Sequence, residues 1–67
     1  MKNVPKLLDI LRERFEIKND AALAKELGIS PPQISKLRGG ATLGSSVILS
    51  IHERLGVPVK EIRELAE

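Results

Sequence analysis

The segment from residue 19 to residue 40 constrains the fold most, because its apolar residues follow a helical period that a single glycine interrupts. Leu23 and Leu27 lie four residues apart and therefore share one face of a short helix. Gly28 follows directly and can adopt the left-handed conformation that ends a helix. Because a helix this short is unstable alone in water, the rest of the chain must supply a core.

A second short helix is predicted over residues 31–38. Ser30 can cap this helix, and the two prolines that follow suit a first helical turn. Ile34 and Leu37 lie three residues apart and face back toward the preceding helix. Two consecutive glycines then end the helix. Because its apolar residues face the preceding helix, the outward side of this helix is left free for a partner.

Three further helices are predicted from apolar stripes, and no segment alternates as a strand does. The stripes are Val4, Leu8, Leu11 and Phe15; Ile48, Ile51 and Leu55; and Val59, Ile62 and Leu65. Asn19 or Asp20 can cap the helix before Gly28, and Ser45 or Ser46 can cap the fourth helix. We therefore expect one all-α domain of five helices over residues 1–67.

The residue inventory excludes several classes of function. The chain has no cysteine and one histidine, which leaves neither a disulfide nor a zinc site. It also lacks a glycine-rich phosphate loop, so we expect no enzyme activity, no cofactor, no metal and no small-molecule ligand. No apolar run is long enough for a membrane span, and no signal peptide is visible, so we expect a cytoplasmic protein.

The distribution of charge is more informative than the net charge of +2. No carboxylate occurs between Glu26 and Glu53, whereas that interval contains Lys36, Arg38 and His52. A polyanion is therefore expected to bind around the second helix of the central segment.

The outward residues of that second helix suit the edges of DNA bases. With Ile34 and Leu37 buried, the helical wheel directs Pro32 and Lys36 outward. Gln33 and Ser35 lie on either side of them. We expect these four residues to contact bases. A glutamine can form two hydrogen bonds with adenine, and a lysine can donate to guanine O6 and N7.

The chain resembles the helix-turn-helix domain of the Cro and phage-repressor family, the XRE-like transcriptional regulators. The matching stretches are N-D-A-A-L-A, L-G at the turn, I-S-K-L-R-G-G, and L-G-V-P-V-K-E-I after the fourth helix. The resemblance implies a compact five-helix lambda-repressor-like DNA-binding domain. It also implies that residues 31–38 lie in the major groove of a double-stranded operator, as in a repressor of transcription.

The resemblance also implies which residues contact DNA. Those expected near bases are Pro31, Pro32, Gln33, Ser35 and Lys36. Those expected near phosphates, some through backbone amides, are Asn19, Ser30, Arg38, Thr42, Ser45 and Ser46. The family commonly has glutamine where Asp20 stands; because an aspartate cannot donate to a phosphate, we interpret Asp20 as a helix cap.

Two of these residues have alternative interpretations. Lys36 can be an ordinary solvated lysine, and Arg38 can complement the negative end of its helix dipole rather than contact phosphate. RNA binding is not expected, because the only aromatic residue, Phe15, is predicted in the core and cannot stack on bases.

One recognition helix makes few contacts, so a homodimer on a palindromic operator is expected. Its predicted interface is formed by apolar residues near the end of the chain: Val57, Val59, Ile62 and Leu65. Two alternatives remain open: an antitoxin that binds both DNA and a small basic toxin, and a helical protein-interaction module that does not bind DNA.

Overall fold

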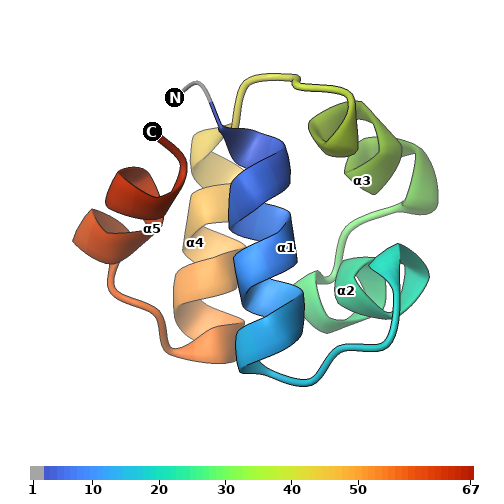
Figure 1. Cartoon of the computed structure of the whole chain (residues 1–67), viewed down its shortest axis with the longest axis horizontal. Coiled ribbons are helices and arrows are strands. Elements are labelled where there is room, and N and C mark those ends of the chain that lie inside the picture. Colours follow the sequence, from blue (N-terminus) through green and yellow to red (C-terminus); the bar gives the residue numbers. More distant parts are fainter. Residues whose placement is uncertain (1–2) are drawn as a thin grey trace.

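Helix α1 (Val4–Arg14) is central to the computed structural model, which describes residues 3–67 (Figure 1). The other helices of this part are α2 (Asp20–Leu27), α3 (Pro31–Arg38), α4 (Ser45–Leu55) and α5 (Val59–Leu65). Helix α1 packs against α3 and α5, while α4 packs against α2 and α5. The protein is therefore all-α, as predicted, and residues 3–67 contain no strand.

Every helix contributes apolar side chains to a single core. Its buried residues are Val4, Leu7, Leu8, Leu11, Leu23, Ala24, Leu27, Ile34, Leu37, Leu43, Val47, Ile48, Ile51, Val57, Ile62 and Ala66. Leu43 lies in the loop between α3 and α4, and the sequence pattern did not identify it as a core residue. Its burial fixes the start of α4 relative to the end of α3, because removing an apolar side chain from water is favourable.

The predicted ends of α2 and α3 are largely confirmed. Asn19, rather than Asp20, caps α2: its side-chain oxygen accepts a hydrogen bond of 2.8 Å from the backbone N–H three residues later. Ser30 caps α3 in the same way at 3.3 Å. Gly28 ends α2 with φ of 69° in the left-handed region, and Gly56 ends α4 with φ of 71°.

The predicted cap of α4 is wrong. Gly44 occupies the capping position, and neither Ser45 nor Ser46 caps the helix, because both serines already belong to its first turn. Both are exposed.

The prediction that Phe15 lies in the core is also wrong. Helix α1 ends at Arg14, so the chain leaves the helical path before its apolar stripe is complete. Phe15 is 37% exposed, and Glu16 follows in the left-handed region with φ of 54°. Ile17 packs against the core instead.

The predicted dimer interface needs correction as well. Val57 is 3% exposed and Ile62 is fully buried, because α5 uses both side chains to close the domain's own core. Val59 and Leu65 are half-buried. In this fold, Val57 and Ile62 are not available to a second subunit.

The first and last residues of the described chain lie close together. The Asn3 backbone N–H donates to the carbonyl oxygen of Ala66 at 2.6 Å, and both ends of the described chain lie at the same side of the molecule (Figure 1). Among residues 3–67, no helix has the length and apolar character needed to cross a bilayer.

Candidate nucleic-acid interface

Helix α3 is amphipathic, with one side buried and the other free. Ile34 and Leu37 are 3% and 4% exposed and anchor the helix to the core. The side chains predicted to contact bases lie on the remaining surface: Pro31, Pro32, Ser35 and Lys36 are exposed, and Gln33 is half-buried. The structure therefore brings all five onto one surface helix, at the right of the view in Figure 1.

The backbone at the start of α3 has few free N–H groups that could donate to an anion. Pro31 and Pro32 have no N–H, and the N–H of Gln33 donates to the Ser30 side chain. The N–H of Ile34 donates to the Ser30 carbonyl oxygen at 3.1 Å. The Ser30 hydroxyl keeps its own hydrogen and can donate it to a phosphate.

The start of α4, in contrast, has free backbone N–H groups. Because no side chain caps this helix, the N–H groups of Ser45 and Ser46 make no hydrogen bond within residues 3–67. Two hydroxyl groups lie beside these free N–H groups, at the positive end of an eleven-residue helix. Exposed Thr42 precedes them in the α3–α4 loop. This combination of donors suits a phosphate oxygen.

Arg38 is half-buried, and its guanidinium is engaged with other parts of the protein. Its Nε donates to Asp20 Oδ2 at 3.0 Å, and its Nη2 donates to Asp20 Oδ1 at 2.7 Å. Its Nη1 donates to Asp9 Oδ1 at 2.6 Å and to the Pro5 carbonyl oxygen at 3.2 Å. Four of the five guanidinium N–H groups are thus used inside the protein. Arg38 joins the end of α3 to α1 and α2 through these contacts, a structural role that neither expectation for it included.

These contacts also determine the charge state of Asp20. The hydrogen bonds from Arg38 lower the pKa of Asp20, the positive charges of Arg38 and Arg12 add to the effect, and partial burial opposes it. The same pairing raises the pKa of Arg38. Asp20 therefore stays ionised with its negative charge compensated, and it does not oppose a polyanion beside α2 and α3.

Lys36 has no acidic partner within residues 3–67, and its exposed ammonium gives the outer side of α3 a positive charge. Asn19 is exposed, but its side-chain oxygen is engaged in capping α2, which leaves its amide hydrogens free to donate. We use the name α3 surface for the exposed side of α3 together with the exposed residues Asn19, Ser30, Thr42, Ser45 and Ser46.

Sequence reasoning missed the charge cluster that positions α3. Asp9 and Arg38 are 29 residues apart, and helical periodicity does not indicate which surface charges meet across helices. The only two aspartates of the sequence, Asp9 and Asp20, both take part in the cluster, but nothing in the local pattern separates them from the neighbouring glutamates.

Comparison of the chain with models of protein families, with curated proteins and with solved structures found no match.

Proposed function

We propose that this protein binds double-stranded DNA in a sequence-specific manner and acts as a small repressor-type regulator of transcription. In this proposal α3 enters the major groove, where Gln33 and Lys36 contact base edges and Pro31 and Pro32 pack against thymine methyl groups. One observation carries the proposal: α3 buries only Ile34 and Leu37 and presents a basic, carboxylate-free side to solvent.

The start of α4 supports the same arrangement. Phosphate contacts give a protein its position on the duplex, and free N–H groups at a helix start are suited to this role. Ser45 and Ser46 supply two such groups, and Thr42 adds a hydroxyl.

The size of the domain favours two copies on one operator. Its longest extent is 24 Å, whereas successive major grooves on one face of B-DNA are about 34 Å apart. One domain therefore covers one half-site, and a homodimer on a palindrome would cover both. The two alternatives, an antitoxin with a toxin partner and a helical module without DNA binding, are not tested by any contact within residues 3–67.

Selection of bound duplexes from a random pool tests this function. We expect enrichment of a two-fold symmetric motif whose half-sites lie about one helical turn apart. Recovery of unenriched sequences, or binding that does not weaken as salt rises, would overturn the proposal.

Lys36→Ala tests the proposed base contact. Loss of one base-directed side chain costs about 1–3 kcal/mol, so the selected duplex should bind roughly 5- to 150-fold more weakly. Preference over a scrambled duplex should fall with it. Lys60→Ala removes an exposed lysine on α5 and should change neither value. If both variants bind alike, Lys36 does not read bases.

Ser46→Pro tests the phosphate contact at α4. Proline occupies the same second helical position in α1 (Pro5) and α3 (Pro32), so the helix should tolerate it while losing one free N–H. Binding to all duplexes, selected or scrambled, should weaken by a similar factor, measured by fluorescence anisotropy. A loss confined to the selected duplex would contradict the assigned role.

A further inference from the structure

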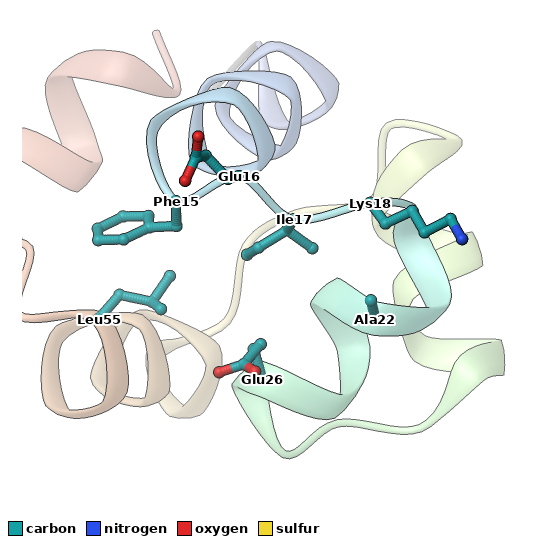
Figure 2. A pocket seen from close by; sticks show the side chains of 7 residues that line it. All are labelled: Phe15, Glu16, Ile17, Lys18, Ala22, Glu26 and Leu55. Atoms are coloured by element: carbon teal, nitrogen blue, oxygen red, sulfur yellow. The ribbon is translucent and has the colours of Figure 1, made fainter.

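A second surface feature lies where the ends of α1 and α4 approach α2. It is an open pocket of about 360 Å³, shown in Figure 2. Its apolar lining comes from Phe15, Ile17, Ala22 and Leu55. The residues of the α3 surface do not line it.

The apolar lining is incompletely covered by the protein itself. Phe15 is 37% exposed, and Ile17 and Leu55 are half-buried against the core. Figure 2 shows the Phe15 ring and the Leu55 side chain on the same side of the pocket. A partner side chain inserted here would remove this apolar surface from water, which favours association.

Two carboxylates border the same pocket. Glu16 comes from the end of α1 and Glu26 from α2, and in Figure 2 they flank the apolar lining from opposite sides. Neither forms an ion pair within residues 3–67. The Lys18 side chain is directed away from both of them in the same view.

Four further glutamates of the described chain also form no ion pair, so the two carboxylates differ only from those that pair with arginine. Asp9, Asp20 and Glu61 are each paired with an arginine. Glu16 also adopts φ of 54°, a backbone conformation that residues with a side chain rarely adopt. The pocket thus combines exposed apolar carbon with uncompensated negative charge.

We propose that this pocket docks a partner protein through one large aliphatic side chain flanked by lysine or arginine on an amphipathic segment. The aliphatic side chain fills the space between Phe15 and Leu55, and the flanking cations pair with Glu16 and Glu26. A symmetric pocket-to-pocket contact between two copies of this chain does not meet that requirement, because it would bring like carboxylates together. This inference goes beyond the proposed function and does not depend on it.

Random twelve-residue peptides displayed on phage provide the test, with the intact protein immobilised. The enriched peptides should share one aliphatic residue with at least two lysines or arginines beside it. Synthetic copies should bind Glu16→Gln/Glu26→Gln about fivefold more weakly, because two rim charge pairs are lost. Glu64→Gln/Glu67→Gln removes the same number of exposed carboxylates elsewhere and should leave binding unchanged.

Four results would overturn the proposal, and the first three concern the peptides. They are the absence of an enriched motif, an enriched motif that is acidic or purely apolar, and equal binding by the two double variants. A fourth is self-association of the protein in sedimentation that Phe15→Ser abolishes, because the occupant would then be a second copy.

Discussion

Arg38 illustrates how little the position of a charged residue on a surface helix says about its partner. It lies at the end of α3, where either a phosphate contact or an interaction with the helix dipole was expected. Its guanidinium instead makes a bidentate contact with Asp20 and a further hydrogen bond with Asp9. A bidentate arginine–carboxylate pair fixes orientation as well as distance. At the scale of single residues, this cluster holds α3 in place so that other side chains face outward.

The variant Arg38→Met should destabilise the fold by about 1–2 kcal/mol, because it leaves partly buried Asp20 without its hydrogen-bonding partner. Urea unfolding measures this loss as a lower midpoint at an unchanged slope. Arg63→Met, which removes an exposed arginine on α5, is the matched control and should cost far less. Equal stability of the two variants would show that the cluster does not stabilise the fold.

The lowered pKa of Asp20 predicts a pH dependence of stability. Because the folded state favours the ionised carboxylate, its contribution is complete above the unfolded pKa of about 4 and is lost as pH falls through the lower folded pKa. Asp20→Asn should therefore lose less stability than the wild type between about pH 6 and pH 2. Urea midpoints across that range measure the effect, with Glu64→Gln as control. Parallel curves for wild type and Asp20→Asn would contradict it.

At the scale of helices and turns, short polar residues and glycines determine the boundaries. Gly28 and Gly56 end α2 and α4 with nearly the same φ, yet their surroundings differ. A Cβ at Gly28 would lie 2.7 Å from Arg54 Nη2, whereas a Cβ at Gly56 would have no neighbour within 4 Å. The two positions therefore separate backbone strain from crowding.

Gly56→Ala should cost about 1–2 kcal/mol, the penalty of a left-handed alanine. Gly28→Ala should cost slightly more, because the flexible Arg54 side chain must also move. Thermal unfolding compares the two variants. When Gly28→Ala is made in a protein that already carries Arg54→Ala, its additional cost should equal that of Gly56→Ala. If Gly28→Ala stays worse with Arg54 removed, crowding by Arg54 is not the cause.

Sequence periodicity predicted elements better than it predicted their ends. The bounds of α3 followed from Ser30, the two prolines and the glycine pair, all of which act locally on the backbone. Phe15 was misplaced because an apolar stripe does not show at which residue a helix stops. The burial of Val57 and Ile62 depends on how α5 packs against the rest of the core, which a local pattern does not contain.

The exposed side of α3 could be predicted from the sequence, because Ile34 and Leu37 alone determine which way the helix faces. The uncapped start of α4 could not. Either serine can cap a helix, and only the three-dimensional path of the loop through buried Leu43 places Gly44 at the capping position.

At the scale of the whole molecule, two surfaces of different charge character have separate places. The α3 surface combines Lys36 with hydroxyl and N–H donors, and the two carboxylates that contact α3 through Arg38, Asp9 and Asp20, are both paired with that arginine. The pocket near Phe15 has two carboxylates without partners within residues 3–67. This separation would let the protein hold a polyanion and a basic partner at the same time.

The central claim, that the outward side of α3 contacts DNA, is tested most directly by nuclear magnetic resonance. The ¹⁵N-labelled protein would be titrated with its selected duplex while the backbone amide shifts are followed. We expect the largest changes at Gln33, Ser35, Lys36, Ser45 and Ser46, while the amides around Phe15 and Leu55 stay unchanged. Changes confined to α5 or to the Phe15 pocket, with α3 unaffected, would contradict it.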